Sequence, residues 1–342
     1  MKIFIRYTFL FIFVFQSNAQ LADFNSINFE KADAIALEYE DETLHNLPDL
    51  AYKLTSNLTT DAARFRAIFK WVCSNVANDY YLYSRNKRKR LRYKTDSLQL
   101  KEWNDRFNKI VFEKLLSDRK TICTGYAYLI KELANLAGID CEIVHGFART
   151  STMNIKNLDV PNHSWNAVKL DGKWYLCDPT WASGIPNPSS AQFEFQFNDG
   201  FFLSDPHIFS VNHFPADEKW FLLEDAKPSF EAFLEAPIIY GQAYAHFNSH
   251  NAPQKLENTV HKDEAVIFKL QLQKNIQKED ITLVIESTFR ERKVKPTSVS
   301  IEDLSLTIGH KFTATGYYDV HLYIKKDLIS SYTFEVKKAA SK

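Results

Sequence analysis

Residues 120–141 read KTICTGYAYLIKELANLAGIDC, and residues 161–184 read PNHSWNAVKLDGKWYLCDPTWASG. In the first stretch, apolar or small side chains recur every three or four residues from Cys123 to Ala137, which predicts one face of a helix that stops at Gly138. Cys123 is therefore expected at the N-terminus of that helix. Unpaired backbone N–H groups and the positive end of the helix dipole stabilise a thiolate at such a position.

The second stretch contains Asp171-Gly172 between two runs rich in apolar and aromatic residues, which is a strong signal for a β-hairpin. A two-residue loop places Trp165 opposite Asp178 and makes Asp178 a diagonal neighbour of His163 on the same face. A three-residue loop instead pairs Asp178 with Asn166 and turns it away from His163, unless a bulge corrects the register. The sequence alone leaves both registers open.

Cys123, His163 and Asp178 together are the residue types of a thiol nucleophile system. A neutral thiol is a modest nucleophile, an imidazole can accept its proton, and a carboxylate fixes the tautomer and orientation of that imidazole. The alternative is structural, because a lone cysteine is often a small buried hydrophobe and a strand histidine is often a packed core residue. Three such residues in one region favour the catalytic interpretation.

Four blocks of the chain resemble the transglutaminase-like superfamily of papain-type cysteine enzymes and, within it, the kyphoscoliosis-peptidase-like branch. The blocks are RFRAIFKWVCSNVANDYY (64–81), RKTICTGYAYLIKELANLAGIDCEIVHG (119–146), NHSWNAVKLDGKWYLCDPTWASG (162–184) and FFLSDPHIFSVNHFPADEKWFLL (201–223). The resemblance is specific because the blocks follow one another in order and at sensible spacing. The chain departs from the family at Thr121, where the family often has a glycine two places before the cysteine.

This resemblance implies Cys123 as the nucleophile, His163 as the base and Asp178 as the orienting acid, with no cofactor and no metal ion. It also implies an α+β, papain-like core of the transglutaminase type, with a helical part and an antiparallel sheet. The implied reaction is acyl transfer at a protein or peptide amide through a thioester. Water as the acceptor gives a peptidase or amidase, and an amine gives a cross-linking transglutaminase. A noncatalytic protein-interaction module that keeps the fold is the remaining alternative.

The groups that would support this chemistry are less clearly marked in the sequence. The backbone N–H of Cys123 is a natural oxyanion donor, and a second donor is expected from upstream, where Gln99, Trp103 and Tyr80 are candidates. Further neighbours either line the cleft or pack in the core: Trp165, Trp181, Asn162 and Tyr126.

The composition indicates a globular chain with no general electrostatic preference for a partner class. The 342 residues are 45% hydrophobic, and Lys+Arg and Asp+Glu are equal at 42 each. Lys2 and Arg6 precede an apolar run, and Ser17-Asn18-Ala19 offers small residues at the positions before a cleavage site. This pattern predicts a cleavable signal peptide over residues 1–19. We expect a secreted or periplasmic protein with a protein or peptide substrate, no nucleic acid partner and no stable membrane insertion. The oligomeric state is not indicated.

The four cysteines are too few and too scattered for a disulfide scaffold. Cys73 falls inside an amphipathic helix that is preceded by Thr60-Asp61, a good cap, and that should pack beside the Cys123 helix. Cys141 and Cys177 are placed so that a bridge between them is possible, with buried free thiols as the alternative. No cysteine–histidine spacing predicts a zinc site.

The remaining sequence divides into an N-terminal lead-in, a basic insertion and a second domain. Residues 20–50 are acidic and polar and predict a lead-in with one helix before a transglutaminase-like domain over 51–227. Seven basic side chains between residues 85 and 94 are interpreted as a solvated loop or helix end rather than an anion-binding patch. Residues 237–340 predict an all-β, immunoglobulin-like sandwich. Its expected strands are AVIFKLQL, ITLVIES, LSLTIGHKFTA, YYDVHLYI and SSYTFEV.

Overall fold

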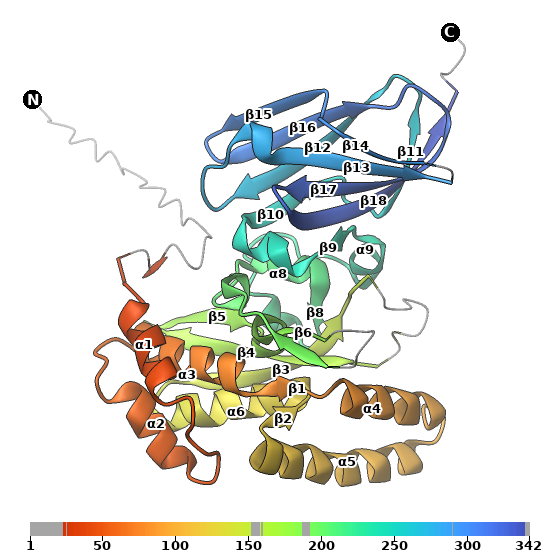
Figure 1. Ribbon diagram of the computed structural model, residues 1–342. Coiled ribbons are helices and arrows are strands. Elements are labelled where there is room, and N and C mark those ends of the chain that lie inside the picture. Colours follow the sequence, from red (N-terminus) through yellow and green to blue (C-terminus); the bar gives the residue numbers. More distant parts are fainter. Residues whose placement is uncertain are drawn as a thin grey trace, which may run out of the picture.

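The structure is a computed structural model, and it shows a mixed α+β core followed by two β-sheets (Figure 1). The described residues are 23–24, 26–151, 158, 160–186, 192–288 and 290–338. The predicted signal peptide, residues 1–19, lies outside the described residues. Within the described part, no helix has both the length and the apolar character needed to cross a membrane.

Most helices of the core come from the N-terminal half of the chain. The α-helices are α1 (Glu30–Glu38), α2 (Leu47–Thr55), α3 (Asp61–Asn75), α4 (Tyr80–Arg92), α5 (Ser97–Asp118), α6 (Cys123–Leu136), α7 (Pro179–Ser183), α8 (Pro206–Asn212) and α9 (Phe230–Glu235). The predicted helix around Cys73 is confirmed as α3, whose N-cap Thr60 accepts a hydrogen bond from the backbone N–H of Ala63 at 3.2 Å. Helix α3 packs against α6, as the sequence predicts.

The lead-in contains α1 and the start of α2 rather than one helix. Arg66 of α3 is buried and forms an ion pair with Asp33 of α1, with 2.6 Å between Nε and Oδ1. Asn46 caps α2, so this helix begins before the predicted boundary at residue 51. The lead-in is therefore packed into the hydrophobic core of the helical part.

A four-stranded antiparallel sheet in the order β5-β4-β3-β8 forms the other half of the core. Its strands are β5 (Lys173–Cys177), β4 (His163–Leu170), β3 (Cys141–Ala148) and β8 (His213–Pro215), and α6 packs against β3 and β4. Two short pairs complete this part: β1 (Ala77–Asn78) parallel to β2 (Lys120–Thr121), and β6 (Gly184–Pro186) antiparallel to β7 (Phe193–Phe195). Figure 1 shows α2 to α6 on one side of the sheet, and α8, α9 and the second region on the other.

The C-terminal region consists of two sheets that share a hydrophobic interior. One has the order β10-β12-β16-β15, and the other has the order β11-β18-β17-β13-β14, with β9 also pairing β18. The rings of Phe268 and Tyr332, one from each sheet, lie 5.0 Å apart. The strands are β9 (Ile238–Ile239), β10 (Phe247–Ala252), β11 (Glu257–His261), β12 (Ala265–Leu272), β13 (Ile281–Ser287), β14 (Arg290–Val294), β15 (Ser298–Glu302), β16 (Ser305–Lys311), β17 (Gly316–Ile324) and β18 (Asp327–Lys337).

The junction between the two parts is held by buried polar groups as well as by aromatic packing. The Arg149 guanidinium, at the end of β3, donates to the backbone carbonyls of Leu234, Ala236 and Pro237. The rings of Phe201 and Tyr244 lie 4.3 Å apart across the same junction. The sheet that carries the candidate site is thereby fixed to the start of the C-terminal region.

Candidate active site

Cys123 is the first residue of α6, as predicted from the apolar spacing. Ile122 before it is extended, and no side chain caps the helix, so the first turn presents backbone N–H groups beside the thiol. A Cβ on Gly125 would lie 1.9 Å from the Thr121 Oγ1 atom, so Thr121 packs against the glycine in the first turn. The departure from the family pattern at Thr121 is therefore accommodated inside the fold. Cys123 itself is 9% exposed.

The hairpin register is the two-residue alternative. Asp171 and Gly172 both have positive φ, 49° and 84°, and the ladder runs from Leu170 opposite Lys173 to Asn166 opposite Cys177. His163 is the first residue of β4 and lies beyond the last pair of this ladder. This register directs Asp178 toward the face that carries His163.

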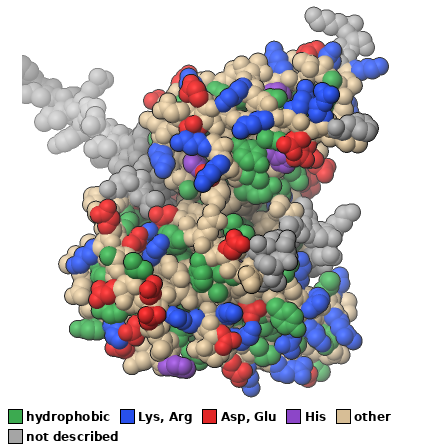
Figure 2. Space-filling model, in the orientation of Figure 1, with side chains coloured by type: hydrophobic (Ala, Val, Ile, Leu, Met, Phe, Trp, Pro, Cys, Tyr) green, Lys and Arg blue, Asp and Glu red, His purple; other side chains and the backbone are tan. Residues whose placement is uncertain are grey.

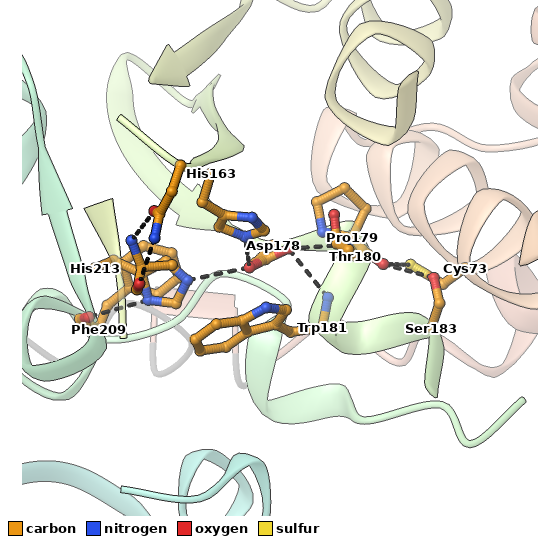
Figure 3. A network of polar contacts seen from close by, with 11 residues as sticks. Cys73, His163, Asp178, Pro179, Thr180, Trp181, Ser183, Phe209 and His213 are labelled. Carbon is orange, nitrogen blue, oxygen red and sulfur yellow. Dashed lines mark hydrogen bonds and ion pairs between the residues drawn. The ribbon is translucent and has the colours of Figure 1, made fainter. Parts of the chain in front are cut away.

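Asp178 leaves the ladder and caps α7, so the extrapolated pairing of Trp165 with Asp178 is not formed. Its Oδ1 atom accepts hydrogen bonds from the backbone N–H groups of Thr180 and Trp181 at 2.9 and 3.1 Å. Its Oδ2 atom lies 2.7 Å from His163 Nε2 (Figure 3). The cap fixes the carboxylate, and the second oxygen is left to orient the imidazole.

A second imidazole, not anticipated from the sequence, also reaches this carboxylate. His213 Nε2 lies 3.1 Å from Asp178 Oδ2 (Figure 3), and the ring stacks on Phe209 with centroids 3.8 Å apart. His213 begins β8, directly after α8, and is fully buried. The sequence signal for it is its place in the block of residues 201–223, because the contact with Asp178 spans 35 residues.

The electrostatics of the site favour charge separation between the thiol and the imidazole. Burial alone would raise the pKa of Cys123, but hydrogen bonding to His163 and the charge of that ring bring it below its ordinary value. Burial would lower the pKa of His163, but the charge and hydrogen bond of Asp178, together with Cys123, raise it to about 10. Because Nε2 is bound to Asp178, Nδ1 is the ring nitrogen left for the thiol.

The pKa values of Asp178 and His213 are both lowered, for different reasons. Burial would raise the pKa of Asp178, but the charge and hydrogen bond of His163, and then those of His213, hold it well below its ordinary range. Burial lowers the pKa of His213, even though its hydrogen bond to Asp178 opposes that shift. The arrangement therefore contains a carboxylate, a proton-holding His163 and a His213 whose Nε2 faces Asp178 and whose Nδ1 faces the Phe209 carbonyl at 3.2 Å.

Aromatic rings surround the two imidazoles. Trp181 stacks on His163 with centroids 5.5 Å apart, and Trp165 lies 6.1 Å from the same ring. Tyr126 is a core residue, since its hydroxyl donates to the carbonyl of Val76. Asn162 binds the backbone of Ala148 through both amide atoms, so it braces β3.

Two of the proposed oxyanion donors are occupied elsewhere. The Trp103 indole donates to Asn86 Oδ1 at 2.9 Å, and the Gln99 amide donates to Asp96 at the exposed start of α5. Tyr80 begins α4 and is 39% exposed. Tyr80 takes part in neither of these hydrogen bonds, so of the three candidates it is the one left for the oxyanion.

The other three cysteines are buried free thiols, so the bridge between Cys141 and Cys177 is not formed. Burial raises the pKa of Cys73, Cys141 and Cys177. Cys73 is in the core, as predicted, with its sulfur 3.5 Å from the carbonyl of Pro179. Cys123 is thus distinguished from every other thiol in the chain by the direction of its pKa shift.

His163, Asp178 and His213 are the group of side chains in the described part whose ligand atoms lie close enough, within 4.8 Å, to hold a metal ion. The Nε2 atoms of His163 and His213 instead both face one oxygen, Asp178 Oδ2, at hydrogen-bonding distances of 2.7 and 3.1 Å. A metal ion would have to displace the proton between His163 and Asp178. The side chains therefore fit a proton-holding network better than a metal centre.

Comparison with known proteins finds similarity in the part of the chain that contains Cys123, His163 and Asp178. Residues 48–179 match the family described as the transglutaminase-like superfamily. Human kyphoscoliosis peptidase is 31% identical over 201 residues, which are 57% of this chain and 27% of that protein. The chain thus spans about a quarter of the length of this curated relative.

Two solved structures are similar only at low TM-scores, which carry no argument about the fold. The Lin-41 filamin domain is 15% identical, with a TM-score of 0.20, and the match covers 24% of this chain and 84% of that one. A structure from Parabacteroides distasonis, described as a candidate protease, is 10% identical with a TM-score of 0.28, covering 89% of this chain and 53% of that one. Residues 48–179, which include Cys123, His163 and Asp178, thus match the transglutaminase-like superfamily, and this part of the chain is similar to kyphoscoliosis peptidase.

Proposed function

We propose that this protein is a thiol-dependent acyl-transfer enzyme that acts on protein or peptide amides through Cys123, His163 and Asp178. One observation carries the proposal: Cys123 begins α6 and interacts with His163, whose Nε2 is held 2.7 Å from Asp178 Oδ2, and of the four cysteines it alone has a lowered pKa. Apolar burial alone would have the opposite effect on the thiol. The helix N-terminus adds a further stabilisation of the thiolate.

The reaction begins when the Cys123 thiolate attacks the carbonyl carbon of the amide. The oxyanion that forms is stabilised by backbone N–H groups at the start of α6. The imidazolium of His163 then gives its proton to the leaving amine, the C–N bond breaks, and a thioester remains on Cys123. An acceptor next attacks the thioester while His163 takes the acceptor's proton, which restores the thiolate–imidazolium pair.

Asp178 and His213 position His163 during these steps. Asp178 accepts the Nε2–H of His163 at 2.7 Å, which keeps Nδ1 directed to the thiol. His213 Nε2 lies 3.1 Å from the same oxygen, so it holds the carboxylate together with the backbone N–H groups at the start of α7. We assign His213 as a positioning residue, since it touches Asp178 and neither the thiol nor the attacked amide.

The acceptor that attacks the thioester determines whether the reaction is hydrolysis or transamidation. Water gives a peptidase or amidase, and the similarity to a protein named kyphoscoliosis peptidase favours hydrolysis. A lysine amine gives a cross-linking transglutaminase, and this outcome depends on how well the occupied cleft excludes water. We further propose export to the periplasm or outside the cell, and an immunoglobulin-like C-terminal sandwich that contacts protein partners.

The experiment offers one protein substrate, unfolded casein, to the wild type and to Cys123→Ala. New N-termini are quantified for hydrolysis, and incorporation of a biotinylated primary amine is quantified for transamidation. We expect new N-termini in the wild type and none with Cys123→Ala. Amine incorporation without cleavage would assign the transglutaminase reaction instead. If folded wild type gave neither product while casein bound equally to both proteins, the noncatalytic interaction module would replace the enzyme.

A further inference from the structure

Helix α4 is held beside the nucleophile by the short β1–β2 ladder. Asn78 pairs with Thr121, and the backbone N–H of Asp79 donates to the carbonyl of Thr121 at 2.8 Å. Asp79 then caps α4 by accepting from the N–H of Leu82. The helix therefore starts next to the residues that lead directly into Cys123.

A small hydrophobic cluster keeps α4 in this place. Leu82 of α4, Trp103 and Phe107 of α5, and Ile122 pack together, separately from the main core. Ile122 is the residue immediately before Cys123. Any substrate chain lying along α4 would consequently pass close to the thiol.

The basic run predicted as a solvated loop or helix end is the body of α4. Its cations form no ion pair with a carboxylate in the part of the chain that the structure describes, in contrast to Lys53, Arg66 and Lys131 elsewhere. Figure 2 shows blue side chains gathered on the side of the molecule where Figure 1 places α4. The cations concerned are Arg85, Lys87, Arg88, Lys89, Arg90 and Arg92.

Arg90 differs from the other cations of this helix. Its Nε atom is buried without a hydrogen-bond partner, and burial lowers the pKa of this guanidinium, with the Cys123 thiolate opposing that shift. Tyr83, two helical turns earlier on the same face, packs against the cluster that contains Ile122, the residue before Cys123. A partly desolvated guanidinium without a carboxylate is unfavourable, and a planar donor group of this kind pairs well with a carboxylate.

Resting on the proposed acyl-transfer function, we propose that Arg90 forms a subsite for a carboxylate of the substrate beside the amide attacked by Cys123. The substrate class is then a protein or peptide segment with Asp or Glu side chains close to the reacting amide. The other cations of α4 raise the local concentration of such acidic segments. Arg90 supplies the direct contact.

The test compares two alkylating reagents of nearly equal size, anionic iodoacetate and neutral iodoacetamide. The measured quantity is the ratio of their second-order rates at Cys123, in the wild type, Arg90→Gln, Arg90→Lys and Arg88→Gln. Arg88 is exposed on the same helix, so Arg88→Gln removes an equal charge from a solvated position. We expect Arg90→Gln to lower the ratio by about three- to tenfold. Arg90→Lys should keep most of the ratio, and Arg88→Gln should change it less than about twofold.

A ratio that is the same in Arg90→Gln and wild type would overturn the carboxylate subsite and leave the acyl-transfer proposal intact. No reaction of folded wild type with either reagent would overturn the acyl-transfer proposal and the subsite with it. A second arm measures protection of Cys123 from iodoacetamide by a glutamate-rich peptide and by its glutamine counterpart. We expect protection by the first only, and its loss in Arg90→Gln. Protection by an RNA oligonucleotide but not by the glutamate peptide would contradict the proposed substrate class.

Discussion

Replacing Asp178 by asparagine exchanges one carboxylate oxygen for an amide group and so tests how the two oxygens are used. Oδ1 accepts from the backbone N–H groups that start α7, and Oδ2 accepts from His163 and His213. If the asparagine oxygen caps α7, the new NH2 group donates to both imidazoles. His163 must then carry its proton on Nδ1, the nitrogen left for Cys123.

The opposite orientation of the amide leaves two buried N–H donors of α7 without an acceptor, at about 1–3 kcal/mol each, so the first arrangement should prevail. Without the carboxylate, the pKa of His163 falls from about 10 toward its ordinary value of about 6.5 or below. The pKa of Cys123 then returns to about 8.5 or above, and at pH 6 less than about 1% of it is thiolate. The smaller thiolate fraction lowers the alkylation rate, and the higher nucleophilicity of a more basic thiolate offsets part of that loss. The alkylation rate at pH 6 should therefore fall by about 10- to 100-fold.

The assay is the second-order rate of iodoacetamide reaction with Cys123 at pH 6, followed by mass spectrometry of the peptide that contains it. Cys73, Cys141 and Cys177 are internal controls, because they are buried and should be labelled only after unfolding. Turnover should fall by a larger factor than alkylation, since it also needs an oriented imidazole. An unchanged rate at pH 6 in folded Asp178→Asn protein would refute the reasoning.

Three further outcomes follow from buried polar groups. His213→Phe should lower turnover by about 10- to 100-fold by removing a hydrogen bond to a charged group, and His213→Gln, which keeps an N–H donor, should recover part of it. His250→Phe in the C-terminal sheets is the control, because it removes a partly buried imidazole bonded to Tyr332 and should leave Cys123 alkylation unchanged. Arg149→Met leaves buried backbone carbonyls at the junction unpaired and should lower the free energy of unfolding by about 2–4 kcal/mol, measured by urea titration. Because the pKa of Asp178 is depressed in the folded state, its contribution is present above the unfolded pKa of about 3.9 and is lost in acid. The difference in unfolding free energy between wild type and Asp178→Asn should therefore narrow between about pH 5 and pH 2; a constant difference would show that Asp178 is not held ionised by its partners.

Local chemistry explains the parts of the site that the sequence predicts. The start of α6 follows from apolar spacing, and the hairpin register follows from Asp171-Gly172, which readily adopt the positive φ that a two-residue loop needs. Strands β12 and β13 have the predicted limits because their side chains alternate between buried and exposed or form a continuous buried run.

Features that depend on distant parts of the chain were not predicted. His213 meets Asp178 because three residues of β8 pair with β3, and so short a strand has no periodicity to detect. Strand β14 is composed almost entirely of exposed charged residues, and it is ordered by pairing with β13 rather than by its own pattern. Helix α4 was interpreted as a loop or helix end because its charges conceal the cap at Asp79 and the single buried Leu82.

The central claim is that Cys123 and His163 exist as a thiolate–imidazolium pair at neutral pH. The most direct measurement is the pH dependence of Cys123 alkylation by iodoacetamide in the wild type and in His163→Ala. The account predicts a wild-type rate that is nearly constant between about pH 6 and pH 8, and a His163→Ala rate that rises about tenfold per pH unit up to about pH 8.5. A wild-type rate that rises in the same way as that of His163→Ala would contradict the pair and the enzyme built on it.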